Sequence, residues 1–116
     1  MITESGFIAA ADRALALIGE AVDAALEVSD ADVDWSLNDG ILEIDCGAKG
    51  KLIVNRHVPN REIWVAARSG GFHFRAVDGT WRDTRADGDL ATSLARLLHE
   101  QAGLGVDFSG LPSAGP

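Results

Sequence analysis

Residues 52–74 read LIVNRHVPNREIWVAARSGGFHF, and this stretch decides the fold that the sequence predicts. Its apolar and β-branched residues favour two β-strands joined near Pro59. A third strand is expected to begin after a turn at Gly70 and Gly71. Strands joined by turns this short pair antiparallel, so the stretch predicts the centre of an antiparallel sheet.

Trp64 is the candidate binding residue within the second of these strands. Residues 62–66 alternate with a period of two, which puts Ile63 and Val65 on one face. If that face is the core, Trp64 lies on the open face of the sheet beside Glu62. Tryptophan is enriched among the residues that dominate binding interfaces, so Trp64 is a candidate partner contact. The alternative is an indole that lies flat over its neighbours and binds nothing.

An amphipathic helix is predicted over residues 5–27, because apolar side chains recur there at the i, i+3, i+4, i+7 spacing of one buried stripe. Ser5 is a candidate N-cap, and Thr3 competes with it for that role. The opposite face carries acidic neighbours with no base between them: Glu20, Asp23 and Glu27.

Further strands and a second helix complete the predicted elements. Alternating apolar and polar residues predict strands over 29–37 and 41–46, and a short strand over 80–82. Asp-Gly pairs in the intervening turns favour hairpins. A leucine-rich helix follows, with Asp87 or Asp89 as its N-cap and Gly103 at its end.

This order of elements predicts an α+β fold. Two amphipathic helices would pack on one face of an antiparallel sheet of about six strands, as a two-layer sandwich whose other face is open to solvent. Residues 1–116 are expected to form a single domain, because 116 residues suffice for one core. Residues 104–111 should pack along the helices, and residues 112–116 are expected to be a flexible tail.

Composition narrows the function. The net charge is −8, yet residues 1–45 hold eleven acids and only one base, Arg13. Such an acidic half argues against nucleic acid or anionic membrane as a partner, and favours cations or a protein with a basic patch. One cysteine allows no internal disulfide, and no apolar run is long enough to span a membrane, so we expect a cytoplasmic protein.

The acidic side chains form the first candidate site. We call seven of them the acidic ridge: Asp12, Glu20, Asp23, Glu27, Asp30, Asp32 and Asp34. Carboxylate oxygens suit hard cations, including Fe²⁺, Fe³⁺ and other divalent ions. An EF-hand does not fit, because Trp35 stands at the loop position that needs glycine and Ile41 at the one that needs glutamate. Metal binding is therefore expected to be weak, and the alternative is a solvated acidic face that binds no metal.

The central stretch also resembles a known family. Residues spread over most of the chain are similar to the signature of the frataxins, called CyaY in bacteria: Asn55-Arg56, Pro59, residues 63–66, residues 70–74 and Trp81. The resemblance implies the same two-layer fold. It also implies that the acidic ridge binds iron and docks on a cysteine desulfurase, in the service of iron–sulfur cluster assembly.

A second surface follows from the same resemblance. Residues that would project near one another on the sheet are implied to contact the desulfurase together with its scaffold protein: Asn55, Arg56, Glu62 and Trp64, with Arg68 close by. Most frataxins compared have glutamine where this chain has Glu62, and the added negative charge is expected to weaken or re-tune that contact. Nothing in the sequence indicates an oligomer, so we expect a monomer.

Catalytic interpretations have less support. The three histidines, His57, His73 and His99, lie on different elements, and none has an obvious serine or cysteine nucleophile beside it. Cys46 is expected to be a small buried hydrophobe. Two alternatives remain to a binding role for iron: a ferroxidase, or an acidic interaction module with no metal. A haem ligand at His57 or Cys46 is a minor further alternative.

Overall fold

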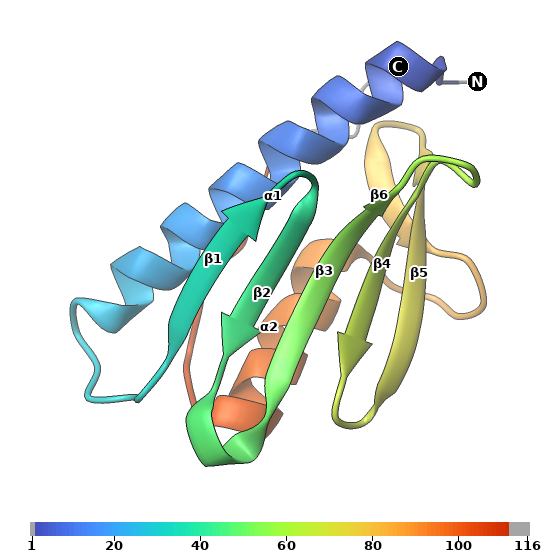
Figure 1. The fold of residues 1–116 in the computed structure, drawn as a ribbon. Helices are drawn as coiled ribbons and strands as arrows, with labels where there is room; N and C mark the ends of the chain where they lie inside the picture. Colours follow the sequence, from blue (N-terminus) through green and yellow to red (C-terminus); the bar gives the residue numbers. More distant parts are fainter. Residues whose placement is uncertain (1, 112–116) are drawn as a thin grey trace.

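The computed structural model describes residues 2–111. It contains one six-stranded antiparallel sheet, and both helices pack on the same face of this sheet (Figure 1). The strands follow one another as a meander, in the order β1 (Asp34–Asn38), β2 (Ile41–Asp45), β3 (Lys51–His57), β4 (Glu62–Ala67), β5 (Gly70–Val77) and β6 (Thr80–Asp83). A short 3₁₀ helix, η1 (Gly47–Lys49), joins β2 to β3. This architecture confirms the predicted α+β sandwich. The tail predicted at residues 112–116 lies outside the described residues.

Helix α1 (Glu4–Leu26) buries the predicted apolar stripe against the sheet. Phe7, Leu15 and Ile18 have no solvent exposure. The helix begins one residue earlier than expected, and Thr3 rather than Ser5 is the N-cap, because the Thr3 hydroxyl accepts a hydrogen bond from the Gly6 N–H at 3.0 Å. No helix among residues 2–111 is long and apolar enough to cross a membrane.

The predicted turn at Gly70 and Gly71 is wrong. These glycines are the first two residues of β5, where Gly70 pairs with Ala67. The ladder between β4 and β5 continues to that pair, so only Arg68 and Ser69 remain to form the turn. Gly70 has a φ of 148°, which side-chain-bearing residues rarely adopt, so glycine here serves the start of a strand instead of the turn.

Helix α2 (Leu90–Ala102) ends the sandwich as predicted. Asp89 is its N-cap and accepts a hydrogen bond from the Thr92 N–H at 2.8 Å, while Gly103 closes the helix in the left-handed conformation. Its leucine stripe is buried, and the segment beyond Gly103 buries further apolar side chains: Leu104, Val106 and Phe108. The expected packing of residues 104–111 is thereby confirmed.

Candidate functional site

The acidic ridge runs from α1 into the first strand. Its members are all exposed, but they lie on three kinds of backbone: Asp12, Glu20, Asp23 and Glu27 on or at the end of α1, Asp30 and Asp32 in the connection, and Asp34 at the start of β1. The strand predicted over residues 29–37 is therefore shorter than expected. The last turn of α1 contains no basic residue. The ridge residues are thus exposed along α1, the α1–β1 connection and the start of β1, which are consecutive along the chain.

Trp35 of β1 connects the strand part of the ridge to the part on α1. Its indole Nε1 donates a 2.7 Å hydrogen bond to the Asp23 carboxylate across the α1–β1 contact. The indole lies directly over Gly19, where a Cβ would come within 2.7 Å of the ring. A glycine in the middle of α1 therefore lets β1 approach the helix closely, and Asp23 is positioned by an uncharged donor.

Few of the ridge carboxylates are neutralised. Asp12 forms an ion pair with Arg56, but no described base pairs with Glu20 or Glu27. Asp34 lies directly opposite Asp45 in the β1–β2 ladder, an arrangement of like charges that destabilises a sheet. Among residues 2–111, no three acidic, histidine or cysteine side chains form a group that could hold a metal ion. Most ridge carboxylates are therefore exposed and form no ion pair with a described base.

Arg56 was expected to project beside Trp64, but the structure places it on the opposite face of the sheet. Asn55 pairs with Trp64 across the β3–β4 ladder and shares its face, whereas Arg56 pairs with Ile63, which points into the core. Strand alternation thus turns Arg56 towards α1, where its guanidinium meets Asp12 and lies 3.7 Å from the carboxylate of Asp39.

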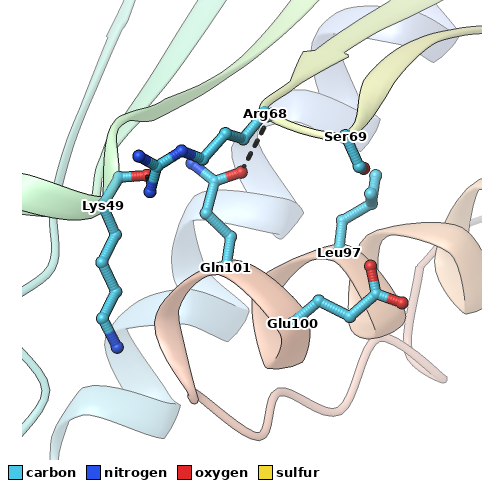
Figure 2. A pocket seen from close by; sticks show the side chains of 6 residues that line it. All are labelled: Lys49, Arg68, Ser69, Leu97, Glu100 and Gln101. Atoms are coloured by element: carbon cyan, nitrogen blue, oxygen red, sulfur yellow. Dashed lines mark hydrogen bonds between the residues drawn. The ribbon is translucent and has the colours of Figure 1, made fainter.

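Arg68 is also separated from Trp64. It lies in the turn after β4, and its backbone N–H donates to the Gln101 side-chain oxygen at 3.1 Å. Its guanidinium donates to the carbonyl of Lys49 at 3.2 Å. Figure 2 shows Arg68 beside Gln101 of α2.

Trp64 is held between two histidine rings on the open face. The ring centroids of His57 and Trp64 are 3.6 Å apart with an 8° angle between planes, and those of Trp64 and His73 are 4.3 Å apart with a 9° angle. Both faces of the half-buried indole are therefore covered, and the edges of the three rings remain for contact. We call these three residues the ring stack.

Glu62 lies beneath the ring stack and is 3% exposed. Its carboxylate accepts hydrogen bonds from Trp64 Nε1 at 2.8 Å and from Arg75 Nη2 at 2.6 Å, and lies 3.7 Å from His73 Nδ1. Burial raises the pKa of Glu62, but the two hydrogen bonds and the charge of Arg75 together outweigh it, so the pKa lies below its usual value. The negative charge that Glu62 adds is therefore buried and paired with Arg75, and its expected effect on a partner contact stays a prediction.

Sequence reasoning missed three residues of this site: His57, His73 and Arg75. Strand alternation could have identified the two histidines. His57 is two residues from Asn55 and so shares its face, and His73 pairs directly with Trp64. Finding them required the correct register between β4 and β5, which the misplaced turn obscured. The expected role of Cys46 is confirmed, since the residue is 5% exposed and burial raises the pKa of its thiol.

Comparisons with known proteins agree with this architecture. Residues 1–104 match the model of the frataxin-like domain. The iron–sulfur cluster assembly protein CyaY of Dechloromonas aromatica is 52% identical over 101 residues, which cover 86% of this chain and 92% of the relative. The protein of the same name from Cupriavidus taiwanensis is 42% identical over 107 residues, covering 92% of this chain and 96% of the relative.

Solved structures show the same fold. Frataxin from Psychromonas ingrahamii superimposes with a TM-score of 0.75 at 30% identity, covering 93% of this chain and 99% of that one. Trimeric yeast frataxin, solved in complex with ferrous iron, gives a TM-score of 0.72 at 24% identity, covering 81% and 86%, and this likeness shows the fold alone. From the matched domain, the curated relatives and the shared architecture, it follows that this chain belongs to the frataxin family, among the CyaY-type members.

Proposed function

We propose that this protein acts in iron–sulfur cluster assembly, where it binds iron weakly on the acidic ridge and docks on a cysteine desulfurase and its scaffold protein. One observation carries the proposal: exposed carboxylates spread over α1 and β1 with almost no compensating base. The names of the curated relatives, which describe iron–sulfur cluster assembly, support the biological setting. The protein would act as a cytoplasmic monomer.

The mechanism is electrostatic. Clustered carboxylates raise the local concentration of Fe²⁺ or Fe³⁺ and attract a basic surface on a partner. Oxygen ligands without an enclosed cage bind with modest affinity and little selectivity, so other divalent cations should compete. Both kinds of binding should weaken as salt is added, because the charges are exposed.

The open face would form a second contact, separate from the ridge. Asn55 and Trp64 lie side by side there, with Glu62 holding the indole from beneath. Since the ring stack covers both indole faces, the partner would meet ring edges and the Asn55 amide. Arg56 and Arg68 are not part of this contact, because they lie on other surfaces.

An NMR titration tests both surfaces. Fe²⁺ added under anaerobic conditions should perturb amides between residues 20 and 34, and a cysteine desulfurase should then perturb the Trp64 indole as well. The double variant Glu20→Gln/Glu27→Gln should lose most of the iron response, while Asp78→Asn/Asp87→Asn, with two exposed acids outside the ridge, should keep it. A ridge that responds to neither iron nor desulfurase would overturn the proposal.

The proposal assigns no enzymatic activity. A ferroxidase would need iron held in a fixed geometry during oxidation, and the ridge supplies exposed carboxylates instead. Ferrous oxidation in the presence of this protein should therefore be no faster than with an unrelated protein of equal negative charge. Faster, saturable oxidation would favour the ferroxidase. An acidic interaction module without a metal role would leave iron binding unchanged in the Glu20→Gln/Glu27→Gln variant.

A further inference from the structure

A pocket of about 430 Å³ lies on the helix side of the molecule, away from the ring stack. It is bounded by η1, the turn between β4 and β5, and the last turns of α2 (Figure 2). Its lining combines bases, an acid, an amide, a hydroxyl and one leucine: Lys49, Arg68, Ser69, Leu97, Glu100 and Gln101. This volume falls within the range of small-molecule sites, about 300 to 1,000 Å³.

The basic side chains that line this pocket form no ion pair with a carboxylate of the described residues. These side chains are Lys49 and Arg68, and they differ in this respect from Arg56 and Arg75, which both form such pairs. The Arg68 guanidinium meets the backbone carbonyl of Lys49, whereas Figure 2 shows the Lys49 side chain extending away from Arg68. The cationic wall of the pocket therefore has capacity for an anion.

Gln101 adds a buried donor to the same wall. The residue is 9% exposed, and its Oε1 accepts the Arg68 backbone N–H at 3.1 Å, which fixes the orientation of the amide. Its Nε2 has no hydrogen-bond partner. A buried N–H without an acceptor is costly, and a ligand oxygen that reached it would remove that cost. The Arg68 guanidinium, held by one 3.2 Å bond to the Lys49 carbonyl, lies near this amide and is free to rearrange around a ligand.

The opposite wall has different chemistry. Glu100 lines the pocket with a side chain that is 51% exposed and 3.5 Å from Arg96, so its carboxylate can accept a further hydrogen bond from a ligand. Leu97 provides the apolar element between the charged walls, and the Ser69 hydroxyl can donate or accept. A ligand that satisfies both walls carries a carboxylate at one end and an ammonium group near the other.

We propose that this pocket binds a small amino acid, with its carboxylate at Arg68 and Gln101 and its ammonium group at Glu100. A simple carboxylate satisfies only the cationic wall, and inorganic phosphate brings more negative charge towards Glu100. The proposal concerns a surface separate from the acidic ridge and does not depend on iron binding.

A titration of the ¹⁵N-labelled protein at constant ionic strength tests the site with matched probes. The probes are L-glutamate, glutarate (the same chain without the amino group) and inorganic phosphate. Glutamate should shift the Gln101 side-chain amide and the Ser69 backbone amide saturably, with a lower Kd than glutarate. Phosphate that binds more tightly than either carboxylate would overturn the assignment to an amino acid.

Variants of exposed side chains identify the contacts without disturbing the core. Arg68→Gln should raise the Kd for both carboxylates about tenfold, the size expected for loss of a charge-assisted hydrogen bond. Glu100→Gln should abolish the preference for glutamate over glutarate. Arg82→Gln, an exposed arginine on the open face, is the matched control and should change neither Kd. Equal weakening by Arg68→Gln and Arg82→Gln, or a Gln101 amide that does not shift, would overturn the proposal.

Discussion

Glu62 shows at the scale of one residue how a buried charge organises a surface. Its carboxylate is almost fully removed from water, and isolated burial of such a charge is strongly unfavourable. Hydrogen bonds from Trp64 and Arg75 offset that cost, and the first of them also fixes the indole within the ring stack. Glu62 thereby fixes the position of the Trp64 indole on the open face.

Replacement of Glu62 by glutamine should destabilise the fold. Glutamine keeps an oxygen for the Trp64 N–H but offers Arg75 no negative charge, so we expect the free energy of unfolding to fall by about 1 to 2 kcal/mol. Urea denaturation at neutral pH measures the change. The matched control is Glu43→Gln on the same face, whose exposed 2.6 Å pair with Lys51 should contribute less than about 1 kcal/mol. An equal loss in both variants would contradict the role assigned to burial.

The stability difference between the wild type and Glu62→Gln should depend on pH. The pKa of Glu62 is lowered in the folded state from its usual 4.5, so the ionised carboxylate stabilises the fold. That contribution is complete above pH 4.5 and is lost as the pH falls through the folded-state pKa. Urea denaturation between pH 3 and 7 should therefore show the two proteins converging in acid. A difference that stays constant down to pH 3 would contradict the lowered pKa.

Between elements, the closest approach is that of α1 and β1. Gly19 leaves the space into which the Trp35 ring fits, and the Trp35–Asp23 hydrogen bond connects the two elements through a member of the acidic ridge. In an ordinary helix, replacing a central glycine by alanine stabilises by about 1 kcal/mol. Here the added methyl group would overlap the indole.

Gly19→Ala should therefore destabilise the protein by about 1 to 3 kcal/mol, as overpacking does, and displace the Trp35 indole. Thermal or urea unfolding measures the loss, and the Trp35 Nε1–H resonance reports the broken bond to Asp23. In a Trp35→Ala background the same substitution should become neutral or stabilising, since no ring occupies the space. A Gly19→Ala variant that is more stable than the wild type would contradict the close packing.

For the whole molecule, the uneven distribution of charge is the dominant feature. Glu27 lies at the negative end of the α1 dipole, and Asp34 faces Asp45 directly, so both should lower stability. A protein surface selected for stability alone would place bases among these acids. The presence of these acids at a cost in stability supports the binding role proposed for the ridge.

Partial neutralisation of the ridge should stabilise the fold. The double variant Glu27→Gln/Asp34→Asn should gain about 0.5 to 1 kcal/mol at low salt, because it removes like-charge repulsion. Added NaCl should raise the Tm of the wild type more than that of the variant, since salt screens the same repulsion. Asp87→Asn, an exposed acid outside the ridge, should change little. A loss of stability in the double variant would show that these carboxylates make favourable contacts instead.

Prediction from the sequence succeeded where a pattern depends on neighbours along the chain. The apolar period of α1, the leucines of α2 and the Asp-Gly turns each carry their structural preference within a few residues, and all appear in the structure. Prediction failed where faces and registers had to be matched between strands. Arg56 faces away from Trp64 because alternate residues of β3 point to opposite faces, and Gly70 pairs with Ala67 because the β4–β5 ladder extends as far as the two-residue turn.

The sequence by itself therefore determined the order and amphipathicity of the elements, the location of the acidic ridge and the family, since these follow from composition and local spacing. Only the tertiary structure decided which side chains meet. It buried Glu62 under Trp64, stacked His57 and His73 on the indole, and turned Arg56 to α1. The physical reason is that a shift of one residue in strand register moves every side chain to the opposite face, and no local pattern records that choice.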